Sequence, residues 1–537
     1  MDQFTRETWI RRTKLAAAIL LLDVSVTFHN IWPTPAIKWT GELSVELAIC
    51  LAALAIVSGR LGPPSRAALA WLSAIWPALV IGRYADVTAP ALYGREVNLF
   101  WDLRNVSAVA AMFASAAPLW LILLTLMAAA LVLVLLYAMS RWAFGRIGEA
   151  MAQPRERTAT LWLAAAAVAL FATQAASERV PRVPGFAAPV TQTYAHQVRL
   201  VRDALSADSR SLAPSPAMDS DLALVKGADV FLFFVESYGA VSYERPEFAR
   251  GLAASRAEFA AAVAATNRHV VSAYVESPTF GGNSWLAHIS LLSGVEVRDR
   301  DTNALLMTRK RDTLATAFAR QGYRTLALMP GTWQSWPEGA FYGFSDIYGG
   351  ERLAYRGPQF GWWNIPDQFA LAQMDALEVS RQTRAPLFVF FPTVSTHIPF
   401  TPTPPYQPDW PRMLTDEPYD EMVLLQAYEQ QPDWLDLGPS YVGAMSYVYA
   451  AIGGYLRQRA DRDFVAIVIG DHQPPSVVSG EGAPWDVPVH VIASRNDVLA
   501  RLQAHGFRAG LTPARPALSR MHALTPVLLD AFGNREP

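Results

Sequence analysis

The sequence is short of cysteine and of charge. A single cysteine, Cys50, stands among 537 residues, so no disulfide can form within the chain. Charged residues make up only 17% of the chain and sum to a net charge of −2, which gives no support to a nucleic-acid-binding protein or a polybasic membrane patch. We expect no nucleic-acid partner, and a fold that relies on its hydrophobic core.

Long apolar runs are also missing after about residue 180, although 52% of all residues are hydrophobic. The runs concentrate in the first third of the chain, which predicts a transmembrane domain over residues 1–178. We expect a bundle of five membrane-spanning helices, at Leu15–Trp32, at Leu43–Val57, at Ala67–Ile81, within Val106–Ser140 and at Ala159–Ala176.

Basic residues flank these runs unevenly. They cluster before the first run and in the second and fourth loops, and basic loops stay in the cytoplasm, so the N-terminus is predicted inside. Five crossings would place the large C-terminal domain, residues 220–537, outside the cytoplasm, after a partly helical linker over residues 179–219. We expect a multi-pass protein of the inner (cytoplasmic) membrane whose large domain lies in the periplasm or outside.

Strand-like apolar runs alternate with helical stretches beyond residue 220. This alternation predicts an α/β domain with a mainly parallel sheet flanked by helices on both faces. The predicted strands are Asp229–Val235, His269–Val275, Tyr323–Met329, Pro386–Phe391, Phe464–Ile469 and Pro488–Ala493. The predicted helices are Phe248–Asn267, Thr313–Gln321, Pro366–Arg384 and Tyr441–Arg459.

Polar or nucleophilic side chains follow five of these strands. Because the carboxyl ends of parallel strands meet at one edge of a sheet, where ligands bind, we expect these side chains to lie close together. Carboxylate and imidazole side by side after the fifth strand suggest a metal site. In strand order the residues are Glu236, Ser284, Trp336, His397, and the adjacent pair Asp471 and His472.

Each residue also has a simpler interpretation. Glu236 could be a solvated turn residue, Asp471 a helix cap and His397 a core histidine. Ser284 could be the N-cap of a helix, but a helix N-terminus also stabilises the anion of a phosphorylated serine, so the two roles are compatible. The coincidence at five strand ends favours a functional site.

These motifs resemble the alkaline phosphatase and sulfatase superfamily. The membrane anchor with an exported domain is similar to lipoteichoic acid synthases and related phosphoglycerol transferases. The resemblance is strongest at Glu236 and Ser237, at the glycine-led Ser284, at Ser395 to His397, and at Asp471 and His472.

The resemblance implies a set of roles. One divalent metal, Mn or Zn, is expected to be held by Glu236, Ser284, Asp471 and His472. Ser284 would be the nucleophile, and His397 would contact the substrate phosphate and stabilise charge or relay a proton.

Other positions are less settled. We assign Asn283 and Trp336 to substrate binding, but the arginine that follows this tryptophan in the synthases is missing. Thr279 competes with Ser284 as the nucleophile, since the family's usual nucleophile is threonine. Ser284 also lacks the proline and arginine that sulfatases require after their modified residue, which argues against a sulfatase.

The predicted function is metal-dependent transfer of a phospholipid head group through a phosphoseryl intermediate. The donor would be phosphatidylglycerol or phosphatidylethanolamine, and the acceptor a glycan or a lipid outside the cytoplasm. Two alternatives remain open: a metal-dependent phosphatase or phosphodiesterase with the same site, and a non-catalytic membrane scaffold of the same fold.

Overall fold

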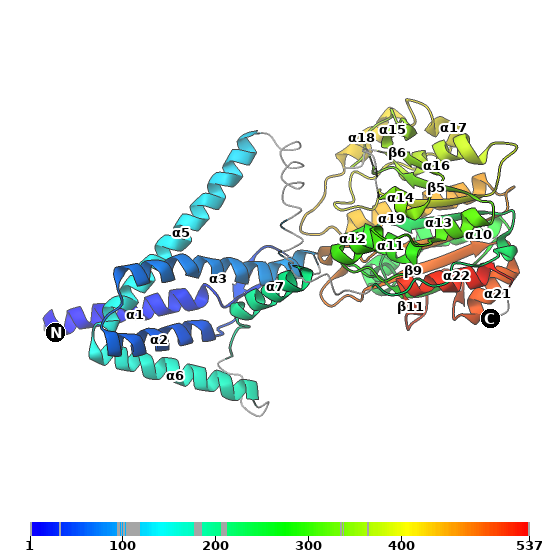
Figure 1. Cartoon of the computed structure of the whole chain (residues 1–537). Helices are drawn as coiled ribbons and strands as arrows, with labels where there is room; N and C mark the ends of the chain where they lie inside the picture. The colour runs from blue at the N-terminus through cyan, green and yellow to red at the C-terminus, as the bar shows by residue number, and fades with distance from the viewer. Residues whose placement is uncertain are drawn as a thin grey trace. The chain divides into compact units, whose positions relative to one another are not determined.

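The chain forms two compact units, Met1–Asp208 and Ser209–Pro537, hereafter the N-terminal and C-terminal units (Figure 1). The computed structural model describes residues 3–31, 34–93, 97, 99, 103, 119–176, 185–205, 212–332, 336, 338–361 and 365–534.

The described part of the N-terminal unit is mostly helical. A small two-stranded antiparallel sheet, which the sequence did not predict, follows α1 where the first span was expected to continue. The described elements of the N-terminal unit are α1 (Gln3–Val24), β1 (Phe28–Asn30), β2 (Ile37–Trp39), α2 (Val45–Leu61), α3 (Arg66–Tyr93), α5 (Leu119–Met151), α6 (Pro154–Ala176) and α7 (Val190–Leu205).

Within the described residues, three helices are long and apolar enough to cross a membrane, namely α3, α5 and α6. The expectation of five spans is therefore not met. With 17 residues, α2 rises only about 25 Å, less than a hydrocarbon core of about 30 Å. The first twelve residues of α1 carry Glu7, Arg11, Arg12 and Lys14, which leaves too short an apolar stretch. Residues 104–118, inside the fourth predicted run, lie outside the described residues.

A nine-stranded sheet forms the centre of the C-terminal unit, in the order β10-β4-β9-β8-β3-β7-β5-β6 with β11 beside β4. All six predicted strands are present, with ends shifted by at most two residues. The strands are β3 (Asp229–Val235), β4 (His269–Glu276), β5 (Arg324–Met329), β6 (Asp346–Gly349), β7 (Leu387–Pro392), β8 (Phe464–Gly470), β9 (Asp486–Ala493), β10 (Arg508–Ala509) and β11 (Ser519–Arg520).

The sheet is mixed, and the parallel strands that were expected form its larger part. Strand β9 runs antiparallel to both of its neighbours, β8 and β4, whereas β8, β3, β7, β5 and β6 are parallel. A parallel strand needs a crossover, usually through a helix, but the connection from β8 to β9 holds only the four-residue α20 (Ser476–Ser479). Pro474 and Pro475 begin this connection and disfavour a longer helix.

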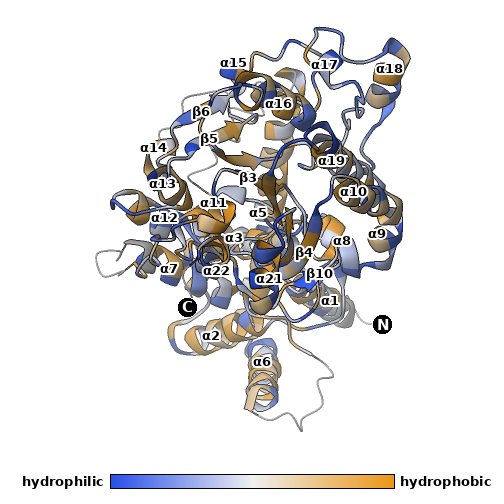
Figure 2. Cartoon of the chain, turned by 90° about the vertical axis from the view of Figure 1, so that its right-hand side faces the viewer, coloured by the Kyte–Doolittle hydropathy of each residue, from blue (hydrophilic) through white to orange (hydrophobic). Residues whose placement is uncertain are grey.

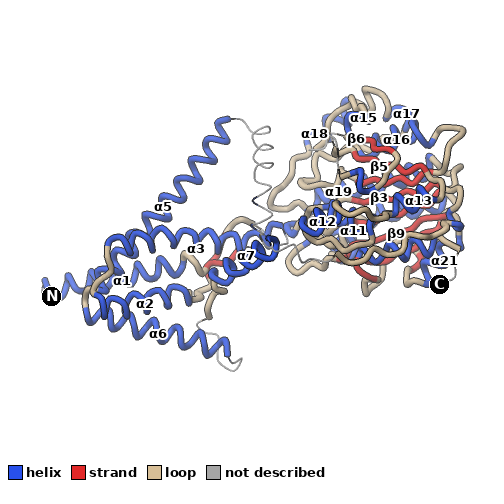
Figure 3. The backbone as a smooth tube through the Cα atoms, viewed as in Figure 1, coloured by secondary structure: helices blue, strands red, loops and turns tan. Residues whose placement is uncertain are grey.

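Helices cover both faces of the sheet, as Figure 3 shows with strands in red between helices in blue. Side chains of β3 alternate between the two hydrophobic cores, with Phe233 in one and Phe234 in the other. This two-sided burial explains the unbroken apolar run of β3, which lies among the orange hydrophobic strands of Figure 2.

The first core packs under α10 (Ala253–Ala265), α16 (Asp367–Met374) and α19 (Gly438–Gln458), and the second under α11 (Ser284–Ser293), α13 (Leu314–Arg320) and α22 (Leu524–Phe532). The remaining described helices are α8 (Val241–Glu244), α9 (Pro246–Gly251), α12 (Arg300–Met307), α14 (Gly339–Tyr342), α15 (Gly350–Leu353), α17 (Trp410–Met413), α18 (Glu421–Glu429), α21 (Asn496–Ala504), the π-helix Asp375–Val379 and the 3-10 turns Ala223–Val225 and Met521–Ala523.

A buried ion pair fastens the start of the two central strands β3 and β7. Asp229 accepts hydrogen bonds from Arg384 Nη1 at 2.7 Å and from Arg384 Nη2 at 2.6 Å. The backbone N–H of Leu387 also donates to Asp229 Oδ1, at 2.8 Å. The carboxylate therefore has a two-pronged partner and a backbone donor, which compensates for its removal from water.

We predict that Arg384→Ala lowers the free energy of unfolding of the C-terminal unit by about 3 kcal/mol, because it leaves the buried Asp229 carboxylate without its cation. Arg412→Ala is the matched control, since Arg412 forms an exposed pair with Asp420 and its loss should cost less than about 1 kcal/mol. Urea denaturation followed by circular dichroism measures both. Equal losses in the two variants would contradict the role given to the buried pair.

Candidate metal centre and nucleophile

The register of two neighbouring strands brings two acidic residues together. Strands β3 and β8 are parallel, and Val235 lies opposite Gly470, so the next residues, Glu236 and Asp471, leave the sheet side by side. A side chain at position 470 is excluded, because its Cβ would collide with the carbonyl oxygen of Tyr238. The glycine before the acidic pair is thus required by the close approach of the two chains.

The turn after β3 is held in place by hydrogen bonds from other segments. Ser237 has a left-handed backbone conformation, with φ of 58°, and its N–H donates to Asp471 Oδ1 at 2.8 Å. Tyr441 donates its hydroxyl to the Ser237 carbonyl at 3.0 Å. The Glu236 N–H donates to Thr393 Oγ1 at 3.1 Å. These contacts fix the direction in which Glu236 leaves the sheet.

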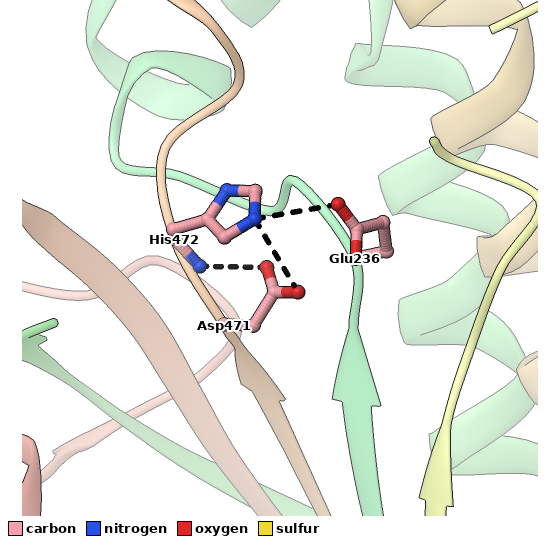
Figure 4. Close-up of side chains that lie close together, drawn as sticks. All are labelled: Glu236, Asp471 and His472. Carbon is pink, nitrogen blue, oxygen red and sulfur yellow. Dashed lines mark hydrogen bonds and ion pairs between the residues drawn. The ribbon is translucent and has the colours of Figure 1, made fainter. Parts of the chain in front are cut away.

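Glu236, Asp471 and His472 form a group that could hold a metal ion (Figure 4). His472 Nε2 lies 3.3 Å from Glu236 Oε1 and 3.7 Å from Asp471 Oδ2. One ligand atom from each residue lies within 4.8 Å of the others. The side chains are buried, with 8% of Glu236 and 1% each of Asp471 and His472 exposed.

The orientation of His472 suits a metal ligand. Its Nδ1 lies 2.7 Å from the Gln473 carbonyl oxygen, which can only accept, so Nδ1 carries the proton and donates. Nε2 therefore faces the two carboxylates. A histidine fixed through its other ring nitrogen is the usual arrangement around protein metal sites.

Burial and mutual charge shift the pKa values of all three residues. Burial works to raise the pKa of Glu236, but the attraction of His472 outweighs it and holds that pKa below its usual range. Burial and the nearby Glu236 charge raise the pKa of Asp471 well above its usual value. Burial alone would lower the pKa of His472, but Asp471 and Glu236 raise it to about 9. Two buried carboxylates share one imidazole, and a divalent cation would neutralise both, so the donor set fits the predicted metal.

Ser284 joins this group from helix α11. Its hydroxyl donates to Glu236 Oε2 at 2.7 Å and lies 3.2 Å from His472 Nε2. Ser284 is the first helical residue, and the N-cap position, considered for it above, belongs to Asn283, whose φ is 60°. Asn283 thus precedes the hydroxyl at the positive end of the helix dipole.

Thr279, the competing nucleophile, is engaged elsewhere. Its hydroxyl donates to the Gly282 carbonyl at 2.6 Å, and the residue is only 4% exposed. It shapes the glycine turn before α11, whereas the Ser284 hydroxyl reaches the acidic group. The geometry favours Ser284.

His397 lies on the loop that follows β7. The electrostatic effect of His397 adds to the lowering of the Glu236 pKa, after the larger effect of His472. The neighbouring Thr396 donates its hydroxyl to the Glu236 carbonyl at 2.6 Å, which ties this loop directly to the candidate metal ligand Glu236. The His397 Nδ1 donates to the Ile398 carbonyl at 2.8 Å.

Sequence reasoning missed Asp367, which anchors the same loop. The Asp367 side chain, 1% exposed, accepts the N–H of Val394 at 2.8 Å and that of Ser395 at 3.0 Å. Burial raises its pKa to about 6. No local pattern marks Asp367, because its partners lie 27 and 28 residues further along the chain.

A second missed residue is His288, one turn after Ser284 on α11. Its ring packs against Phe234 and Phe390, with centroids 4.7 and 5.4 Å away. Its Nε2 is buried and has no hydrogen-bond partner among the described residues, and burial lowers its pKa to about 3, so the ring is neutral. In the sequence, His288 stands four residues after Ser284, and this helical spacing was the signal that could have pointed to it.

Trp336 packs beside the second core. Its ring stacks on Tyr342 with centroids 5.1 Å apart, and it lies on the α11 face of the sheet. The structure thus brings Glu236, Ser284, Asp471 and His472 into direct contact, links His397 to them through its loop, and gives Trp336 an aromatic neighbour.

Comparison with known proteins gives one family match. Residues 296–491 match the family model Sulfatase, a range that includes His397, Asp471 and His472. A search of curated proteins finds no match.

Solved structures similar to this chain include several enzymes or enzyme domains. The lipoteichoic acid synthase LtaP from Listeria monocytogenes is 14% identical, with a TM-score of 0.34 over 54% of this chain and 71% of that one. The Streptococcus pyogenes phosphoglycerol transferase GacH is 12% identical, with a TM-score of 0.36 over 62% and 79%. The periplasmic domain of EcEptC from Escherichia coli is 14% identical, with a TM-score of 0.34 over 53% and 76%.

The match of residues 296–491 to the Sulfatase family model confirms the sulfatase part of the resemblance stated from the sequence.

Proposed function

We propose that this chain transfers the head group of a membrane phospholipid to an acceptor hydroxyl on a glycan or lipid outside the cytoplasm. The observation that carries the proposal is the Ser284 hydroxyl, which lies at the start of a helix and within hydrogen-bond distance of both Glu236 and His472. A hydroxyl in such a setting is suited to nucleophilic attack on phosphorus.

Glu236, Asp471, His472 and Ser284 would hold one divalent metal, Mn or Zn. When bound, such a cation would neutralise the negative charge of a phosphodiester and lower the pKa of the serine hydroxyl. Two carboxylates and an imidazole suit either metal, and the only cysteine, Cys50, lies in the N-terminal unit.

The chain's own groups account for the two steps. Ser284 Oγ forms a bond to phosphorus as the bond from phosphorus to the diacylglycerol oxygen breaks. The Ser284 proton passes to water, and His397 supplies a proton to the departing oxygen. An acceptor hydroxyl then attacks phosphorus and gives its proton to His397, the bond from phosphorus to Ser284 Oγ breaks, and the Ser284 oxygen takes a proton back from water.

The N-terminal end of α11 stabilises the intermediate. Ser284 lies in the first turn of a ten-residue helix, so a phosphate on its oxygen would face unpaired backbone N–H groups and the positive end of the helix dipole. This stabilisation is absent for a phosphate on Thr279, which precedes the helix.

The membrane helices favour a lipid as the donor of the head group. A phospholipid stays in the bilayer, so an enzyme with membrane-spanning helices keeps its site near the lipid. We propose that the N-terminus lies inside, that the protein is multi-pass in the inner membrane, and that the C-terminal unit faces the periplasm or the outside. The apolar helices α3, α5 and α6 support this placement.

We predict that Ser284→Ala lowers release of diacylglycerol from labelled phosphatidylglycerol or phosphatidylethanolamine, with Mn or Zn present, by about a thousandfold or more, because it removes the nucleophile. Thr279→Ala, the matched control, should stay within about tenfold of wild type, since Thr279 only shapes the turn. The reverse order would assign the nucleophile to Thr279. Equal rates in wild type and both variants would refute the transfer mechanism.

A second prediction concerns the covalent intermediate. Acid quenching of wild type incubated with the lipid donor alone should leave the peptide containing Ser284 heavier by the head-group phosphate, as read by mass spectrometry. Adding an acceptor should discharge it into a phosphorylated acceptor. Free head-group phosphate forming at the same rate with or without acceptor would instead identify a hydrolase, and a chain that neither binds metal nor cleaves lipid would be a scaffold.

A further inference from the structure

A basic groove lies apart from the metal centre, between the end of α12 and α14. Its volume is about 520 Å³, within the range typical of ligand sites, and it opens to the surface. Figures 1 and 2 both show α12, α13 and α14 next to one another on the C-terminal unit. None of its lining residues belongs to the metal-binding group or the nucleophile.

Three consecutive cations line one side of the groove. Arg309 and Lys310 are exposed, and neither side chain forms an ion pair or hydrogen bond within the described part of the chain. Arg311 is anchored, since its Nη1 donates to the Ala213 carbonyl at 3.1 Å and to Ser215 Oγ at 3.0 Å. By contrast, Arg324 and Arg384 elsewhere in this unit are fully engaged with carboxylates.

The opposite side of the groove is apolar with a single acid. Phe341 and Ala340 come from α14, Met307 closes the groove from α12, and Glu338 is the one carboxylate among the lining residues. Three cations against one carboxylate give the groove a positive potential beside an apolar surface.

The two sides of the groove are held together. Thr313, at the start of α13, donates its hydroxyl to the Tyr342 carbonyl at the end of α14, at 2.6 Å. Tyr342 is itself stacked on Trp336. The groove is thus preformed, so a ligand would not have to order its walls.

We propose that this groove binds a phosphate ester attached to a glyceryl or acyl group. Arginine and lysine side by side can present several N–H donors to the three or more oxygens of a phosphate, and guanidinium groups match phosphate geometry. Met307 and Phe341 would contact the apolar part of the same ligand. Two kinds of ligand share this combination of a phosphate with an organic group: a phospholipid head group and a water-soluble phosphate ester.

Arg309 and Lys310 also have a simpler, purely structural interpretation. Basic residues after the end of a helix also stabilise its dipole, and Arg309 and Lys310 follow α12 closely. That role involves no ligand and would not depend on Glu338, which lies across the groove. A binding measurement with substitutions on both sides therefore distinguishes the two.

The test is isothermal titration of the full-length chain in detergent with sn-glycerol 3-phosphate, and in parallel with phosphatidic acid in mixed micelles. Arg309→Gln combined with Lys310→Gln should weaken binding at least tenfold, because it removes both unpaired cations. Glu338→Gln should strengthen binding about threefold, because it removes the opposing charge. Lys226→Gln combined with Arg508→Gln, which deletes two exposed cations elsewhere, should leave affinity within twofold of wild type.

Binding of glycerol phosphate identifies a water-soluble ester as sufficient, and binding of phosphatidic acid alone identifies a lipid-borne phosphate; both support the site. The proposal is overturned if neither ligand binds, if glycerol binds as tightly as its phosphate, or if the double variant at 309 and 310 binds as wild type does. The readout is binding and not lipid cleavage, so it stands or falls separately from the proposed function.

Discussion

The structure around the candidate site depends on the burial of two carboxylates at the ends of two parallel strands. Glu236 and Asp471 leave β3 and β8 at the same level because Val235 and Gly470 are paired in the sheet. Bringing two acids into the interior is costly unless positive charge accompanies them. His472 supplies one positive charge, and a divalent cation would supply the rest.

The surrounding contacts all serve to hold those oxygens in place. Asp471 accepts the N–H of Ser237, Thr396 holds the Glu236 carbonyl, and the His472 ring is fixed through Gln473. The first two contacts join segments that follow different strands, and the third lies within the segment after β8. The sheet thus positions the loops at its edge, and these loops hold the candidate functional side chains, as is usual for open α/β sheets.

The sequence allowed much of this arrangement to be predicted. Strands buried on both faces leave continuous apolar runs, so β3, β7 and β8 were found with nearly correct ends, whereas β6, β10 and β11 are too short to leave a pattern. The direction of β9 was missed because it depends on the length of the helix in the preceding connection, not on the strand's own residues.

The same reasoning explains what was found and missed at the site. Glu236 and the pair Asp471 and His472 directly follow strong strand signals, so their meeting could be inferred. Asp367 acts through backbone groups of a distant loop and carries no local signature. Counting apolar runs gave more spans than the three long apolar helices of the described residues, because charged residues occupy the start of α1 and α2 is about 5 Å shorter than the hydrocarbon core.

Metal analysis tests the central claim most directly. Full-length wild type supplied with Mn or Zn, then desalted and measured by inductively coupled plasma mass spectrometry, should retain about one metal per chain, in keeping with one set of ligands. Asp471→Asn should lose most of that metal, while Asp436→Asn, a change outside the site, should keep it. Equal metal content in wild type and Asp471→Asn, or no retained metal in either, would contradict the account.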